Sequence, residues 1–157
     1  MRKRVDTRLP SLVSLYEAVV ALSGWGALIA ATRAPAPSPE AVPAALFLLL
    51  TVALKHEGFQ VARLVTHSLG GVAALAAVLA LEPPLGAWVA ALAALVFLAT
   101  RSPAGERRFG LAHARLLLFG GGLNGLMALS GAWLYRALGG RWGQSSLGRS
   151  DLAPLLA

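Results

Sequence analysis

The stretch LLLFGGGLNGLMALSGAWLYRALGG, residues 116–140, decides the fold class of this chain. It is mostly apolar, and it is longer than the roughly 20 residues that a helix needs to cross a lipid bilayer. Its middle nevertheless holds an amide, Asn124, with four glycines within four residues of it. An unpaired amide in hydrocarbon costs on the order of several kcal/mol, so we expect Asn124 to face another helix.

The same stretch predicts close helix packing. Helices in lipid associate through small residues and interhelical hydrogen bonds. Gly121 and Gly125 form a GxxxG pair, and helical spacing gives one small, partly polar face that contains Gly120, Asn124, Ala128, Gly131 and Tyr135. We therefore expect Gly121, Gly125 and Gly131 to pack against a neighbouring helix. Two interpretations of Asn124 stay open: a hydrogen bond to that helix, or a contact to a bound ligand.

The composition indicates a helical membrane protein. Of the 157 residues, 57% are hydrophobic and 13% are charged, and the mean hydropathy is +0.67. A soluble domain usually carries about 25% charged residues. We therefore expect a single integral membrane domain over residues 1–157, folded as an all-α polytopic transmembrane helix bundle of five to six helices. The absence of cysteine excludes disulfides, thiolate metal sites and cysteine nucleophiles.

Apolar runs predict where the helices lie. The five runs are residues 12–31, 42–54, 64–81, 85–99 and 116–138, and proline occurs in three of the four linkers between them. A basic segment before the first run resembles a signal peptide, but the run is longer than a usual signal core, so we expect a retained helix. Asp151 is placed to cap a sixth helix that would be interrupted at residue 157. We expect either a longer natural chain or a docked stub there.

The basic residues predict the orientation. With the N-terminus inside, ten Lys and Arg lie in inside segments and four in outside segments. This asymmetry favours a cytoplasmic N-terminus in a multi-pass protein of the inner membrane. The tryptophans agree, because all of them fall at predicted outer ends: Trp25, Trp88, Trp133 and Trp142. The net charge of +7 does not indicate nucleic acid, because the basic residues lie between apolar runs and suit an anionic leaflet instead.

Two ionisable residues join Asn124 as ligand-binding candidates. Glu17 lies inside the first run, and a carboxylate within a membrane segment is a functional candidate by default. It either contacts a ligand, with His67 as its partner, or lies near enough to the interface to pair with Arg8 or Lys55. We expect His67 to lie one turn into the third helix, on the same inner side.

Enzyme chemistry is not expected. His56 and His113 fall in predicted loops, so the three histidines do not share the matched depth that a haem or metal site needs. Ser68 next to His67 is no catalytic pair, because adjacent residues on a helix do not face each other. We expect no metal, no cofactor and no catalytic residue.

A resemblance to a known kind of membrane region indicates a function for this predicted membrane protein. The segments Val65–Gly70, Leu81–Ala87 and Asn124–Gly140 together resemble the membrane-embedded N-terminal sensor region of bacterial signalling proteins with an HD-type phosphohydrolase or diguanylate cyclase output. The usual Gly-Pro of that region is replaced here by Glu82-Pro83-Pro84. The resemblance implies a non-catalytic sensor or anchor that binds a small ligand or a partner between helices, with any enzyme activity outside this chain.

A second resemblance gives the alternative. The turn Pro84–Ala87 is similar to one in the substrate-binding membrane subunit of energy-coupling-factor vitamin transporters, which docks a coupling subunit through small residues of its first helix. Here that helix carries Ser14, Ala18, Ala21, Gly24, Ala27 and Ala31. Glu17 interrupts their face. Under either interpretation the expected partners are the lipid bilayer and a membrane or cytoplasmic subunit. A purely structural subunit of a larger membrane complex is the third class.

Overall fold

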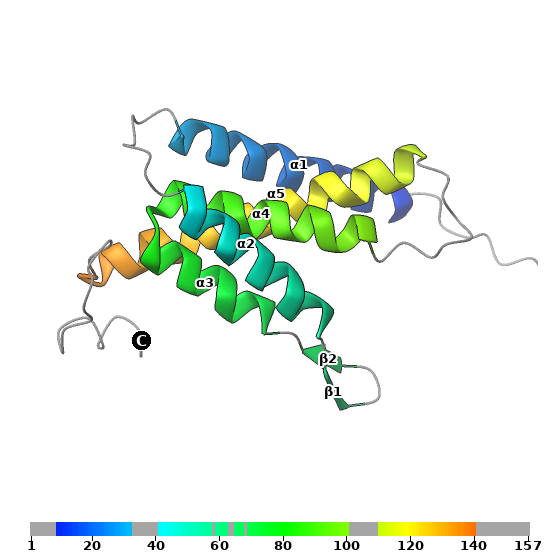
Figure 1. Ribbon diagram of the computed structural model, residues 1–157. Helices are drawn as coiled ribbons and strands as arrows, with labels where there is room; N and C mark the ends of the chain where they lie inside the picture. The colour runs from blue at the N-terminus through cyan, green and yellow to red at the C-terminus, as the bar shows by residue number, and fades with distance from the viewer. Residues whose placement is uncertain are drawn as a thin grey trace, which may run out of the picture.

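The computed structural model describes residues 9–32, 41–57, 59–62, 65–67, 69–100 and 110–140. These residues form five helices and one short hairpin (Figure 1). The helices are α1 (Leu9–Ala31), α2 (Ala41–His56), α3 (Gly70–Ala80), α4 (Pro83–Thr100) and α5 (Leu111–Ala137), and the hairpin is β1 (Phe59–Ala62) with β2 (Val65–His67). The all-helical architecture expected from the sequence is confirmed for this part of the chain, apart from the hairpin.

Helix α4 lies at the centre of the bundle. It contacts α2 and α3 on one side and α5 on the other, while α1 packs mainly on α5. Its buried face consists largely of alanine, which lets neighbouring backbones come close. The turn from α3 is tight: a Cβ built on Gly86 would lie 2.5 Å from the Cα of Val78. Pro83 begins α4, where a missing backbone N–H costs nothing.

The helices alternate in direction along the chain. Helices α1, α3 and α5 run one way, and α2 and α4 run the opposite way (Figure 1). The hairpin lies at one end of the bundle, together with the first residues of α1, α3 and α5 and the last residues of α2 and α4. We call this the hairpin end. It corresponds to the end for which the sequence predicts a cytoplasmic location.

The third predicted helix is wrong in its first part. The sequence predicts a helix over residues 64–81, whereas α3 begins only at Gly70. The preceding residues form β2, which pairs antiparallel with β1 through Phe59↔His67 and Gln60↔Thr66. The β-branched residues Val65 and Thr66 favour an extended chain, and backbone pairing with β1 outweighs the apolar helical pattern. The other four predicted helices are each found within five residues of their expected bounds.

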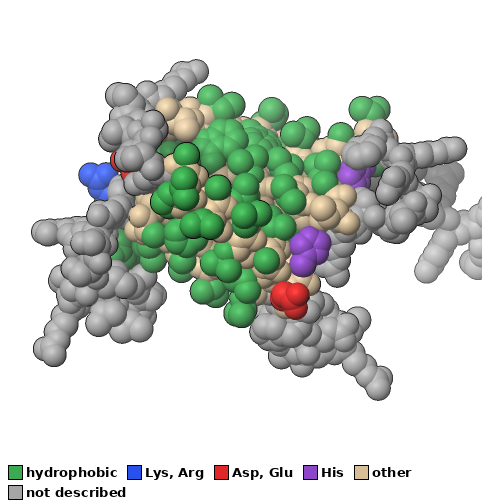
Figure 2. Space-filling model, in the orientation of Figure 1, with side chains coloured by type: hydrophobic (Ala, Val, Ile, Leu, Met, Phe, Trp, Pro, Cys, Tyr) green, Lys and Arg blue, Asp and Glu red, His purple; other side chains and the backbone are tan. Residues whose placement is uncertain are grey.

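Three helices are long and apolar enough to cross a membrane: α1, α4 and α5. Helices α2 and α3, with 16 and 11 residues, are shorter than a bilayer span. Large apolar side chains cover the outside of the bundle, as Figure 2 shows for one face. Leu22 is 76% exposed, Leu49 67% and Val72 65%. Such a surface fits contact with lipid or with other proteins rather than with water.

Some predictions lie outside the described residues. These are the sixth helix from Asp151, the position of Trp142 and the contact of Arg8 with Glu17. Nothing in the structure tests them.

Candidate functional site

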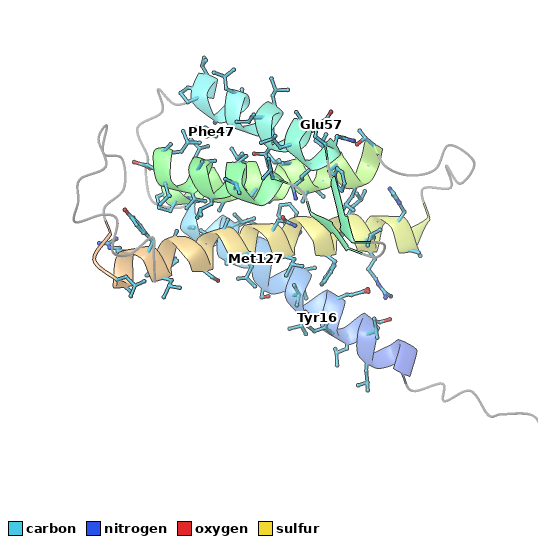
Figure 3. The ribbon with its side chains drawn as sticks, turned by 90° about the horizontal axis from the view of Figure 1, so that it is seen from below. Tyr16, Phe47, Glu57 and Met127 are labelled. Atoms are coloured by element: carbon cyan, nitrogen blue, oxygen red, sulfur yellow. The ribbon has the colours of Figure 1, made fainter. Side chains whose placement is uncertain are left out.

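A close contact between α1 and α5 holds the first helix to the bundle. A Cβ built on Gly24 would lie 2.7 Å from the Cα of Gly122, and one built on Gly122 would lie 3.0 Å from the Cα of Ala21. The two backbones therefore touch directly, which only small residues allow. Seen from below, α1 crosses α5, and Tyr16 lies on the part of α1 toward the hairpin end (Figure 3). Its ring contacts that of Phe119, with 6.0 Å between the ring centroids.

The predicted packing glycines differ in what they contact. A Cβ on Gly121 would lie 2.6 Å from the Trp25 side chain, and one on Gly125 would lie 3.1 Å from Cγ of Leu28. Both therefore lie against α1, and a Cβ on Gly121 would also lie 3.2 Å from the Leu95 side chain of α4. Gly131 is different, because a Cβ there would meet no atom of the described residues within 4 Å. The structure therefore shows no packing partner for Gly131 within the part of the chain that it describes.

Trp25 is a packing residue rather than a free anchor at the outer interface. Its indole N–H donates to the backbone carbonyl of Leu118 on α5 at 2.9 Å. Its ring lies against Trp88 of α4, with 5.7 Å between the ring centroids. Trp25 thus contacts both neighbouring helices. The sequence pattern showed only its depth along the helix and not its inward direction.

Asn124 finds a partner on a helix that barely touches α5. Its Oδ1 accepts a hydrogen bond from Nζ of Lys55 at 3.2 Å. Its Nδ2 donates to the carbonyl oxygen of Gly120, one turn earlier in α5, at 2.9 Å. Lys55 lies at the end of α2, and its long side chain spans the gap to α5. We call this Lys55–Asn124 hydrogen bond the polar bridge.

A glycine makes room for the polar bridge. Gly70, the buried first residue of α3, has no side chain, and a Cβ there would overlap Cγ of Lys55. The lysine stem therefore passes over Gly70 on its way to Asn124. Any larger residue at this position would push the stem away, so the bridge depends on three helices: α2 for the amine, α3 for the passage and α5 for the amide.

The amine of Lys55 reaches toward the middle of the bundle. The next residue, His56, contacts the hydroxyl of Thr100, the last residue of α4, so both lie at the hairpin end (Nε2 to Oγ1, 3.0 Å). Asn124, in contrast, is the midpoint of α5, with thirteen residues on either side. Lysines near the end of an apolar helix usually extend outward to the aqueous interface. The Lys55 side chain instead extends inward, to Asn124.

Glu17 has a different partner from those expected. Its Oε2 accepts from Nε of Arg115 at 2.6 Å, with 25% of the Glu17 side chain and 48% of the Arg115 side chain exposed. Lys55, one of its predicted partners, is bonded to Asn124 instead. Arg115 and Asn124 are nine residues apart, about two and a half helical turns, so they lie on opposite faces of α5. Glu17 and Asn124 therefore do not form one site.

The histidines are placed differently from the prediction. His67 lies in β2 and not in a helix, and its side chain is outside the described part of the structure. His56 and His113, expected in loops, lie in α2 and in the first turn of α5. The His56 ring packs edge-on against Phe97, with 5.1 Å between centroids. Over the described ranges no three His, Asp or Glu side chains gather as a metal would require.

An apolar groove lies at the other end of the bundle. It has a volume of about 840 Å³ and runs between α1 and α5. Ala27 and Ala31 border it from α1, and Leu129, Ser130 and Trp133 border it from α5. It is lined mainly by apolar atoms, so it suits hydrocarbon rather than a polar molecule.

The comparisons with known proteins give no family. No protein-family model, no curated protein and no solved structure matches this chain.

Proposed function

We propose that this chain is a multi-pass membrane protein with its hairpin end in the cytoplasm. Three long apolar helices and the exposed leucines and valines support insertion in a bilayer. The excess of Lys and Arg in the segments at the hairpin end supports the orientation. Helices α2 and α3 are short, and their contacts with α4 support a place beside it in the bundle.

Within that membrane domain, we propose a non-catalytic sensor or anchor module that binds a small ligand or a partner between its helices. The observation that carries this proposal is the polar bridge. A lysine and an asparagine inside an apolar bundle are costly, and such groups in membrane segments usually serve function. Packing alone would be served as well by apolar residues at both positions.

The polar bridge leaves N–H donors of Lys55 without a hydrogen-bond acceptor among the described residues. A lysine ammonium has three N–H donors, and Asn124 takes one. No carboxylate of the described residues pairs with Lys55; the ion pair in this part of the chain joins Glu17 to Arg115. A polar ligand that offers an acceptor would therefore gain hydrogen bonds that the described residues do not supply. This favours ligand contact over a purely structural role for Asn124.

A sensor also needs two conformations whose relative populations a ligand can shift. The polar bridge joins α2 to α5, on opposite sides of the central α4. A ligand that takes Lys55 away from Asn124 would release α2 from α5, whereas α3 has its own contacts with α5. The hairpin directly follows α2, so such a change would be passed to the cytoplasmic end.

Thermal unfolding in detergent with a library of polar metabolites tests this proposal. We expect at least one compound to stabilise the parent protein and to lose that effect in Asn124→Ala. Gly131→Ala is the matched control, because it adds a methyl to the same helix in open space. If no compound stabilises the parent, or if Asn124→Ala responds like the parent, the proposed site is wrong.

The vitamin-transporter alternative has less support. That role needs a small-residue face of the first helix to be free for a coupling subunit. Here Ala21 and Gly24 are in direct contact with α5. The residues best suited to docking a partner are thus already used inside the bundle.

A further inference from the structure

We infer that Lys55 is the receptor for a phosphate-bearing anion that enters at the hairpin end and replaces Asn124 as its partner. This inference rests on the proposed function and names the ligand class of the same site. The phosphate group could belong to a lipid of the cytoplasmic leaflet or to a soluble phosphate, and the chemistry at Lys55 is the same for both.

The partner of Lys55 in the structure is a neutral group. Its amine is half-buried and is bonded to a neutral amide, which satisfies one donor and none of the charge. Ammonium groups gain roughly twice as much from an ionised acceptor as from a neutral one. An oxyanion that reached Lys55 would therefore compete well with Asn124. The amide would lose little, because its Nδ2 keeps the bond to Gly120.

The side chain of Lys55 extends inward from the hairpin end. Lys55 lies beside His56 at the hairpin end, from which a lysine would normally extend into the headgroup layer. There it would come close to the first turn of α3, since its stem already lies on Gly70. The amino end of a helix carries partial positive charge and disfavours a nearby cation. Without an anion, the amine is therefore better placed on Asn124.

Arg115 and His56, which also lie at this end, have partners of their own. Arg115 is already paired with Glu17, so it does not compete for an anion to the same degree. His56 is bonded to Thr100 and packed on Phe97. Unlike Arg115, Lys55 has no carboxylate partner among the described residues. Phosphate suits it, because lysine binds phosphate as a compact point charge.

The chain offers a specific reporter for this exchange. Asn124 is its one asparagine, and Lys3 and Lys55 are its two lysines. Protein labelled with [15N]asparagine therefore gives one side-chain amide signal in an NMR spectrum. The signal would be recorded in dodecyl maltoside micelles, which contain no phosphate, in the same micelles with added phosphatidylglycerol, and in the same micelles with inorganic phosphate, at equal ionic strength.

We expect the Asn124 signal to shift when a phosphate source is present, because Lys55 leaves its Oδ1. A shift with phosphatidylglycerol alone identifies a lipid headgroup, and a shift with inorganic phosphate identifies a soluble anion. Lys55→Met should abolish the response and Lys3→Met should keep it. Lys55→Gln, which keeps a polar end group, replaces Lys55→Met in this experiment if Lys55→Met does not fold.

The inference is overturned if neither source moves the signal of the parent protein, or if the signal moves equally in the Lys55 variants. The proposed function can survive that outcome. A metabolite without phosphate that stabilises the parent through Asn124 would keep the site and remove only the ligand class.

Discussion

Replacing Gly24 by alanine tests how close α1 and α5 are. The added methyl would lie 2.7 Å from the Cα of Gly122 and would also overlap its carbonyl group. These are backbone atoms, which cannot rotate away as a flexible side chain does. The helices would have to separate, and the contacts of Trp25 and Leu28 along the same line would weaken with them. A Cβ built on Gly26, two residues later in α1, would meet no atom of the described residues within 4 Å, so Gly26 is the matched control.

The comparison isolates the packing cost. Both Gly24→Ala and Gly26→Ala remove a helix glycine, which favours the helix by about 1 kcal/mol in each variant. This gain cancels in the difference between them. Overpacking costs about 1–3 kcal/mol, and a backbone neighbour places Gly24 in the upper half of that range. We therefore expect Gly24→Ala to be about 2–3 kcal/mol less stable than Gly26→Ala.

Reversible unfolding by SDS in mixed micelles, followed by circular dichroism, gives both free energies of unfolding. Circular dichroism is preferred to fluorescence because Trp25 lies in the contact itself. If the two variants agree within about 0.5 kcal/mol, the additivity error of such comparisons, the close α1–α5 contact is refuted.

Three further outcomes are expected. Gly125→Leu should destabilise the bundle more than Asn124→Ala, since overpacking costs about 1–3 kcal/mol and a membrane hydrogen bond averages about 0.6 kcal/mol; equal stabilities in the same SDS titration would speak against the argument. Glu17→Gln should cost no more than about 1 kcal/mol, because partly exposed ion pairs contribute little; thermal unfolding that shows a much larger loss would make Glu17 a core residue. In this cysteine-free chain, single cysteines at Ser38 and Ser102 report topology to an impermeant thiol reagent on intact cells; we expect labelling at 38, and labelling at 102 alone would reverse the orientation.

The positions of the helices were largely predictable, whereas their rotations were not. Length and hydropathy place a helix along the chain, and α4 and α5 are found close to their predicted bounds. Rotation is read from a polar face, and these helices are apolar on all sides. The sequence therefore singled out Glu17 and Asn124 as groups in need of partners without showing which residues pair with them.

The partners could not be found for a physical reason. Lys55 and Arg115 looked like ordinary basic residues of the inner loops. Their reach depends on long flexible side chains and on neighbours that leave room, such as Gly70. Gly24 was visible as one small residue among many in the first helix. Its contact with Gly122 depends on where α1 crosses α5, which no local pattern contains.

The hairpin was missed because two signals conflict. Residues 64–81 are apolar enough for one helix, and Val65 and Thr66 alone are too short a β-branched run to reveal a strand. The pairing with β1 decides the outcome, and that is a contact between two segments. His67 lies in β2 and therefore not in the helix where the predicted site placed it. Only the apolar sequence pattern indicated a helix at that position.

A double-mutant cycle on the polar bridge tests the central claim most directly. The free energies of unfolding of the parent, Lys55→Met, Asn124→Ala and the double variant would be measured in the same SDS titration. Side-chain hydrogen bonds in membrane proteins average about 0.6 kcal/mol and reach about 1.7 kcal/mol, so we expect a coupling energy within that range. Effects of the two single substitutions that add within about 0.3–0.5 kcal/mol would show that Lys55 and Asn124 do not interact, and would contradict the account.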